Sequence, residues 1–263
     1  MDRRSADLPS QMPPPSWKWR LTEQMLPYLD KVFDWVCRRG QSSAHHPEVA
    51  AILRRTRPRT DISDHLLTLF TEGLAARPRL IVELGVRGGE STYVLERVAR
   101  LSGGVPLVSV DLEDCTGACR YPNWFFIKSD DVAFAQAFPE WCRERQLPAA
   151  VDLLFIDTSH LYDHTLQEIK HWFPLLSPSA KVVFHDTNLR RIYWRKDGSF
   201  GPAWTNRGVT AAIEACLGVS LPERTDYVDL IGEWMIRHNA LSNGLTVLTR
   251  IPTLNADAEA GAN

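Results

Sequence analysis

The chain has 263 residues, a formal net charge of −2, 44% hydrophobic residues and 24% charged residues. These values are those of an ordinary globular protein, and the near-neutral charge gives no global attraction to nucleic acid. Because of this charge we expect no nucleic-acid partner. No apolar run is long enough to cross a bilayer, so we expect no membrane partner.

The N-terminal stretch carries charges without the apolar segment of a signal peptide, so we expect a cytoplasmic protein. The five cysteines are odd in number and scattered, which favours reduced thiols. Cys115 and Cys119 are spaced too widely for a CxxC pair. A cysteine-bound zinc site is therefore not expected.

The two ends and the first third of the chain predict accessory segments. Residues 1–16 and 253–263 are polar, with many prolines in the first, and are expected to be flexible tails. Residues 17–75 are expected to form an N-terminal helical extension, with a second helix in DISDHLLTLFTEGLAA. Apolar residues recur at helical spacing in its first part: Leu26, Leu29, Val32, Phe33 and Val36.

Residues 76–252 follow a different pattern and are expected to form the catalytic domain. Short apolar runs (LIVELG, LVSVDL, NWFFIKSD, VDLLFID and KVVFHD) alternate with amphipathic segments. This alternation predicts an α/β fold with parallel strands and helices on both faces. The runs GEWMIRHNA and LTVLTRI predict a C-terminal antiparallel hairpin.

Polar residues end each of the five predicted parallel strands. They are Glu83, Asp111, Ser129 with Asp130, Asp157, and His185 with Asp186. Ligands bind at the carboxyl ends of the strands in open α/β sheets, so these side chains are expected to meet at one edge.

The turn after the first strand is rich in glycine. Gly85, Gly88 and Gly89 would allow a ligand close to the main chain, and the helix beginning near Ser91 would attract an anion. Asp111 follows about twenty residues later, as expected of an acid that binds ribose hydroxyls. These features favour an adenosine-type ligand, and a tight turn with surface acids remains the alternative.

The run ELGVRGGES does not have the G-x-G-x-x-G spacing of dinucleotide sites. An acid within the motif would repel a pyrophosphate but suits the ammonium group of S-adenosylmethionine. Glu83 is the candidate for that ammonium, directly or through water. Arg87 or the helix N-terminus is the candidate for the carboxylate of the same molecule.

The segments VELGVRGGES, VSVDL, KSDD and FIDTSHLYDHTLQEIKHWFPLLSPSAKVVFHDTN resemble the class I S-adenosylmethionine-dependent methyltransferases. More narrowly, they resemble the cephalosporin-hydroxylase-like group of antibiotic-sugar methyltransferases, over residues 60–250. The resemblance implies a Rossmann-like seven-stranded sheet, with Asp157 beside the transferred methyl group. Together with the motif it assigns the cofactor to these residues: Glu83, Gly85, Arg87, Gly89, Ser91, Asp111, Ser129, Asp130 and Asp157.

The candidate catalytic residues are Asp157, His160, His185 and Asp186, which can act as bases or orient the acceptor. Related sugar O-methyltransferases hold a divalent metal, and Asp157, His185 and Asp186 are the matching residues here. Histidine suits a hard cation less well than a carboxylate, so a metal is not favoured. His164 and His171 are expected to be solvated.

Residues 187–208 are longer than an ordinary connection and are expected to form a lid-like loop. Their aromatic residues suit a sugar, and their basic residues suit a phosphate. A loop at a homodimer interface is the alternative, and we expect a homodimer.

The predicted function is methyl transfer to an amine or hydroxyl of a sugar-containing molecule in antibiotic biosynthesis. The resemblance points to an aminoglycoside acceptor, as in gentamicin-type N-methyltransferases. A metal-dependent O-methyltransferase of a nucleotide-linked sugar is one alternative. A nicotinamide-dependent oxidoreductase and a non-catalytic S-adenosylmethionine-binding protein are two others.

Overall fold

The computed structural model describes residues 46–58, 60–189, 193–194, 200–201 and 207–252. Internal contacts divide the chain into residues 1–46 and residues 47–263, and of the first unit only His46 is described. Both predicted tails, the predicted helix after residue 17 and most of the 187–208 loop lie outside the described residues. In the part that is described, no helix has the length and apolarity needed to span a membrane.

The second unit is built on an eight-stranded sheet with the order β3-β2-β1-β4-β5-β10-β9-β8. Strands β3, β2, β1, β4 and β5 are parallel, whereas β10, β9 and β8 pair antiparallel. This confirms the predicted mostly parallel α/β sheet with a C-terminal hairpin. The strands are β1 (Ile81–Leu84), β2 (Leu107–Asp111), β3 (Trp124–Lys128), β4 (Val151–Ile156), β5 (Leu176–His185), β8 (Tyr227–Ile231), β9 (Trp234–Asn239) and β10 (Leu245–Arg250). Two short strands, β6 (Tyr193–Trp194) and β7 (Phe200–Gly201), pair separately.

The sheet has one strand more than the seven that the resemblance implied. The additional strand is β8, which pairs only with β9 in this sheet and forms its edge. Val228 is 67% exposed and Leu230 is 65% exposed on this strand. An edge strand with exposed side chains lacks the buried apolar pattern from which the other strands were predicted.

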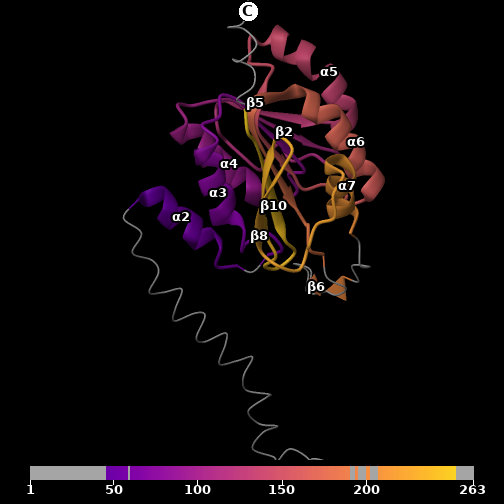
Figure 1. Cartoon of the computed structure of the whole chain (residues 1–263). Coiled ribbons are helices and arrows are strands. Elements are labelled where there is room, and N and C mark those ends of the chain that lie inside the picture. The colour runs from indigo at the N-terminus through magenta and orange to yellow at the C-terminus, as the bar shows by residue number, and fades with distance from the viewer. Residues whose placement is uncertain (1–45, 59, 190–192, 195–199, 202–206, 253–263) are drawn as a thin grey trace, which may run out of the picture. The chain divides into compact units, whose positions relative to one another are not determined.

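Helices cover both faces of the sheet (Figure 1). One layer contains α2 (Pro47–Arg55), α3 (Leu66–Ala75) and α4 (Glu90–Leu101), which pack in one hydrophobic cluster. The other contains α5 (Asp131–Glu144), α6 (Tyr162–Trp172), the 3₁₀ turn η1 (Phe173–Leu175) and α7 (Gly208–Leu217). Helix α2 lies within the predicted helical extension but was not identified as a separate helix, and α7 was not predicted. The four described cysteines carry free thiols, as expected.

Strand β1 separates the two hydrophobic clusters. Ile81 belongs to the cluster beneath α3 and α4, whereas Val82 and Leu84 belong to the opposite cluster. Successive side chains of a strand point to opposite faces, so Glu83 lies on the α3–α4 side with Ile81. A strand buried on both faces usually consists of apolar residues, so the carboxyl group of Glu83 is unusual within β1.

The strand order reverses between β1 and β4, where open α/β sheets form their ligand crevice. Gly85 closes β1 with a φ of +87°, and a Cβ atom there would lie 2.0 Å from the carbonyl oxygen of Asp157. Only glycine therefore allows the ends of β1 and β4 to approach this closely.

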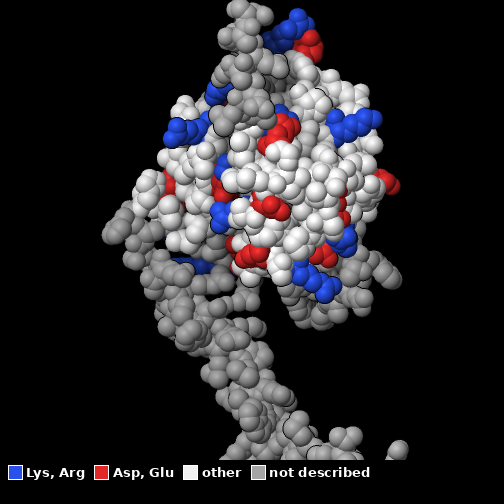
Figure 2. All heavy atoms as spheres, viewed as in Figure 1, with Lys and Arg blue, Asp and Glu red and all other residues white. Residues whose placement is uncertain are grey.

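Figure 2 shows acidic and basic side chains scattered over one face of the described molecule. On that face the described lysines and arginines do not gather into a continuous basic stripe. The expected lack of a nucleic-acid partner stays a prediction.

Candidate active site

The glycine turn after β1 is held by the carboxylate that ends β2. Oδ2 of Asp111 accepts hydrogen bonds from the N–H groups of Val86 at 2.7 Å and Arg87 at 3.0 Å. Oδ1 accepts one from the N–H of Glu113 at 2.9 Å. Burial acts to raise the pKa of Asp111, but these three N–H groups outweigh it and hold the pKa below its ordinary value. Asp111 is therefore an ionised acceptor that organises the turn.

Glu83 lies beneath the turn and is 0% exposed. Its carboxylate accepts hydrogen bonds from the hydroxyl of Thr92, at 3.0 and 2.9 Å, and from that of Ser109 at 2.6 Å. Burial raises the pKa of Glu83 to about 7, although the hydroxyls of Ser109, Ser91 and Thr92 oppose the shift. The carboxyl group thus ties β1 to β2 and to the first turn of α4.

Arg87 has a left-handed backbone conformation with a φ of +45°, and its side chain points to the segment before α3. Its guanidinium contacts both carboxylate oxygens of Asp61 at 2.8 Å. The Arg87 side chain is 71% exposed, so this pair lies at the surface of the crevice. Asp61 was not identified from the sequence, because nothing in its neighbourhood resembles a motif.

A pocket opens over the turn at the switch point. Five of the predicted site residues line it: Gly85, Arg87, Ser91, Asp157 and His160. Its other lining residues are Ile62, Val86, Gly88, Glu90 and Thr158. The remaining predicted residues do not line this pocket.

Some predicted residues instead support the neighbouring backbone. Gly89 is the left-handed N-cap of α4, with a φ of +73°. Asp130 is the N-cap of α5, where its Oδ1 accepts a hydrogen bond from the N–H of Ala133 at 2.8 Å. Ser129 donates its hydroxyl to the carbonyl of Asp130.

The carboxyl ends of β4 and β5 bring together two histidines and two aspartates. Nε2 of His160 donates to Oδ2 of Asp186 at 2.7 Å and lies 3.3 Å from Oδ1 of Asp157. Nδ1 of His185 lies 3.3 Å from the same Asp157 oxygen and 3.4 Å from Asp186. All four predicted catalytic residues therefore form one cluster.

Charge pairing controls protonation in this cluster. Burial acts to lower the pKa of His160, but hydrogen bonds and charges from Asp157 and Asp186 outweigh it and raise the pKa to about 10. The same two acids raise the pKa of His185 well above its ordinary value despite its burial. The charge on His185 in turn outweighs burial and lowers the pKa of both acids. The raised pKa values of the two histidines and the lowered pKa values of the two acids favour ion pairs within the cluster.

The cluster differs from the predicted metal ligand set in one residue. The structure brings together ligand atoms of Asp157, His160 and Asp186, within 4.8 Å of one another. His185, in place of His160, was in the set named from the sequence, but the His185 side chain is 0% exposed. Oδ1 of Asp186 is buried without a hydrogen-bond partner among the described residues, so this oxygen fits a metal ion.

His65 was missed from the sequence. It precedes α3 and is 0% exposed, with its ring 5.5 Å from that of His185 in an edge-on arrangement. Burial and the charge on His185 lower the pKa of His65 to about 4, so its ring is neutral at physiological pH. His65 comes from a helix outside the βα motifs, and no local pattern could have connected it with β5.

His164 was expected to be solvated, but it is only partly exposed and contacts two acids. Its Nε2 lies 3.2 Å from Oδ2 of Asp131 and 3.6 Å from Oε1 of Glu168. These three residues form a second group of potential ligands, between α5 and α6.

Part of the chain is similar to a known protein family and to two curated proteins. Residues 82–187 match a family described as a methyltransferase domain. The chain is 34% identical over 147 residues to the uncharacterized protein y4gI of Sinorhizobium fredii, a match that covers 49% of this chain and 16% of that protein. It is 29% identical over 115 residues to a rhamnosyl O-methyltransferase of Mycobacterium leprae, covering 43% of this chain and 50% of that protein. The chain thus spans half or less of the length of these relatives.

Among solved structures, an O-methyltransferase from Bacillus cereus in complex with SAH has a similar fold. The TM-score is 0.52 at 14% identity, and the match covers 82% of this chain and 97% of that chain. The described part of the chain therefore shares its Rossmann-like fold with this O-methyltransferase, and residues 82–187 match a methyltransferase domain.

Proposed function

We propose that the chain transfers the methyl group of S-adenosylmethionine to a hydroxyl group of a sugar-containing small molecule. The pocket at the switch point carries this proposal, because a glycine turn forms one wall and Asp157 with His160 forms another. The matches to a methyltransferase domain and to a rhamnosyl O-methyltransferase support the reaction and the acceptor class.

The nucleoside of the cofactor is assigned to the turn and to Asp111. A carboxylate has about four lone-pair sites, and in Asp111 three of them accept backbone N–H groups. The Cys115 thiol also forms a hydrogen bond with this carboxyl group, so a ribose hydroxyl would have to displace the thiol. A second ribose contact would require the turn to release one N–H group. Adenine is assigned to the segment after β3, at Ser129 and Asp130.

The methionyl part of the cofactor is assigned to Gly85, Gly89 and the first turn of α4 at Ser91. Its carboxylate would meet the N–H groups of that turn, or Arg87 after exchange from Asp61. Glu83 is a positioning residue in this assignment, since its carboxyl group is enclosed by hydroxyl groups below the turn.

The reaction needs the acceptor oxygen in line with the methyl carbon and the cofactor sulfur. The oxygen–carbon bond forms as the carbon–sulfur bond breaks, the bonding electrons go to the sulfur, and the hydroxyl proton must leave. Asp157 and His160 are the cluster members exposed to the pocket, at 23% and 31% of their side chains. His160 is protonated and already donates its Nε2–H to Asp186, so of the two exposed members only Asp157 can accept the proton, and its lowered pKa makes it a weak base.

The side chains present also fit a divalent cation. Asp157, His160 and Asp186 would be its ligands, and the unpartnered oxygen of Asp186 supports this set. Such an ion would lower the pKa of a bound hydroxyl group. Binding would require His160 to lose its proton, so metal affinity should increase with pH.

Turnover of labelled S-adenosylmethionine tests the proposal, with rhamnosides, nucleotide-linked sugars and aminoglycosides as acceptors, each with and without EDTA. O-methylated sugar is the expected product, and Asp157→Asn should reduce its formation at least about 100-fold. An N-methylated aminoglycoside would instead favour the amine acceptor, which needs no metal. Labelled product from none of these acceptors would contradict the proposed substrate class.

Binding of NADH without binding of S-adenosylhomocysteine would favour an oxidoreductase. Cofactor binding without turnover would favour a non-catalytic protein. The role in antibiotic biosynthesis and the homodimer stay predictions, the second testable by sedimentation.

A further inference from the structure

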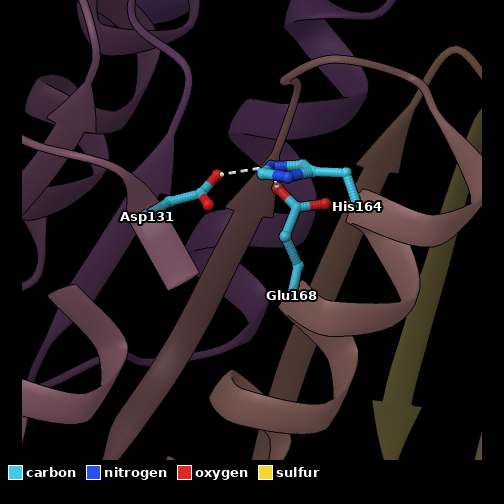
Figure 3. Close-up of side chains that lie close together, drawn as sticks. All are labelled: Asp131, His164 and Glu168. Carbon is cyan, nitrogen blue, oxygen red and sulfur yellow. Dashed lines mark hydrogen bonds and ion pairs between the residues drawn. The ribbon is translucent and has the colours of Figure 1, made fainter. Parts of the chain in front are cut away.

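Asp131, His164 and Glu168 form a group between α5 and α6 (Figure 3). None of the three lines the pocket, but Glu168 contacts Thr158, which does. Asp131 is the first residue of α5, and His164 and Glu168 lie one turn apart on α6. Figure 3 shows both carboxylates next to the imidazole ring of His164, one from each helix. One ligand atom from each residue lies within 4.8 Å of the others.

The two carboxyl groups are buried and incompletely satisfied. Glu168 is 0% exposed and Asp131 is 7% exposed. Oε1 of Glu168 accepts a hydrogen bond from the hydroxyl of Thr158 at 2.7 Å. Oε2 of Glu168 and Oδ1 of Asp131 have no hydrogen-bond partner among the described residues. Buried oxygens of this kind are costly unless a proton or a cation satisfies them.

The spacing of the ligand atoms matches that around a small metal ion. Ligands 2.0–2.2 Å from zinc in a tetrahedron lie roughly 3.3–3.6 Å apart. Nε2 of His164 lies 3.2 Å from Oδ2 of Asp131 and 3.6 Å from Oε1 of Glu168. Both spacings are compatible with an ion between the three residues. The oxygens at these spacings are Oδ2 of Asp131 and Oε1 of Glu168, so the unpartnered Oδ1 and Oε2 reach the ion only after the carboxyl groups rotate. The His164 side chain is 28% exposed, which provides a path from solvent.

We propose that Asp131, His164 and Glu168 form a binding site for a divalent first-row transition ion of the zinc type. An imidazole with two carboxylates suits such an ion better than it suits Mg²⁺ or Ca²⁺, which prefer oxygen ligands alone. The ion would neutralise the two buried carboxylates and complete its coordination with water. It would join α5 to α6 beside Thr158, which lines the pocket.

The competing arrangement has no metal. Glu168 keeps its proton, because burial and the charge on Asp131 raise its pKa well above the ordinary value, and it shares that proton with Asp131. The two arrangements differ in one measurable respect: only the first responds to zinc through His164 and Glu168.

Titration of the chelator-treated full chain with zinc sulfate tests the proposal, with bound zinc and Tm as readouts. The wild type should bind zinc and gain Tm. His164→Asn should lose affinity by more than the roughly 10- to 100-fold that removal of an outer partner costs. In a His160→Asn background, which removes a ligand of the other cluster, Glu168→Gln should abolish the zinc-induced gain in Tm.

Two controls make the result specific. His160→Asn removes a ligand of the other cluster and should leave zinc binding at this site intact. Glu168→Gln without metal should melt at or above the wild-type Tm, because glutamine replaces a carboxyl whose charge is disfavoured there. Loss of zinc binding only in His160→Asn, unchanged binding in both His164→Asn and Glu168→Gln, or no zinc uptake by the wild type would overturn the proposal.

Discussion

Replacement of Glu83 by glutamine tests how the floor of the crevice is built. The carboxyl group of Glu83 is 0% exposed, and burial raises its pKa from 4.5 to about 7 despite hydrogen bonds from Ser109 and Thr92. Glutamine keeps the shape, replaces one acceptor oxygen by a donor NH2 group and has no titrating proton. We therefore expect Glu83→Gln to change the pH dependence of stability.

The sign and magnitude follow from the two pKa values. Between pH 4.5 and about pH 7 the folded protein keeps the Glu83 proton, whereas the unfolded chain releases it. The folded state loses stability as the pH rises through this window, and the loss is complete above it. A shift of about 2.5 units, from 4.5 to about 7, corresponds to about 3 kcal/mol. Glu83→Gln lacks this loss.

Urea unfolding at a series of pH values measures the effect. The free energy of unfolding of Glu83→Gln, relative to wild type, should rise by about 3 kcal/mol from about pH 4 to about pH 8. Thr92→Val is the matched control, because it removes a hydroxyl donor but keeps the ionisable group. Its stability should still fall as the pH rises. Parallel pH profiles for wild type and Glu83→Gln would refute the reasoning.

Two further predictions concern the turn after β1. Gly85→Ala should cost more than about 3 kcal/mol or prevent folding, because the new Cβ would meet the carbonyl of Asp157. Gly103→Ala is the control, because Gly103 also has a positive φ, of +91°, but a Cβ atom there would meet no atom within 4 Å. It should lower the free energy of unfolding by only about 1–2 kcal/mol. Similar losses for the two variants in urea unfolding would contradict the close approach of β1 and β4. Asp61→Asn removes the surface ion pair with Arg87 and should change the unfolding free energy by less than about 1 kcal/mol, whereas a larger loss would mean that the pair holds the turn.

The parallel part of the sheet could be predicted because its strands are buried on both faces. Burial of both faces gives the short apolar runs that mark β1, β2, β4 and β5, and the polar residue after each run marks its carboxyl end. Strand β8 carries exposed Val228 and Leu230 at the edge of the sheet, so its sequence lacks that pattern. Helices α2 and α7 are short, at 9 and 10 residues, and their patterns were not recognised.

The candidate site was predicted where one strand end supplies the residue. Asp157 follows β4, His185 ends β5 and Asp186 follows it, so the topology alone brings them together. Residues from the helices need the packing of one helix on another, which the sequence does not contain. His65 and His164 are of this kind, and the pattern of α6 gave no sign that His164 faces α5.

Calorimetry with S-adenosylhomocysteine tests the central claim most directly. The claim is that the glycine turn and Asp111 hold the nucleoside of a methyl-donor cofactor. We predict one binding site per chain in the wild type and a loss of affinity of at least about tenfold in Asp111→Ala. Asp114→Ala, which removes an exposed acid three residues away, should bind as the wild type does. No heat with the wild type, or equal affinity in Asp111→Ala, would contradict the claim.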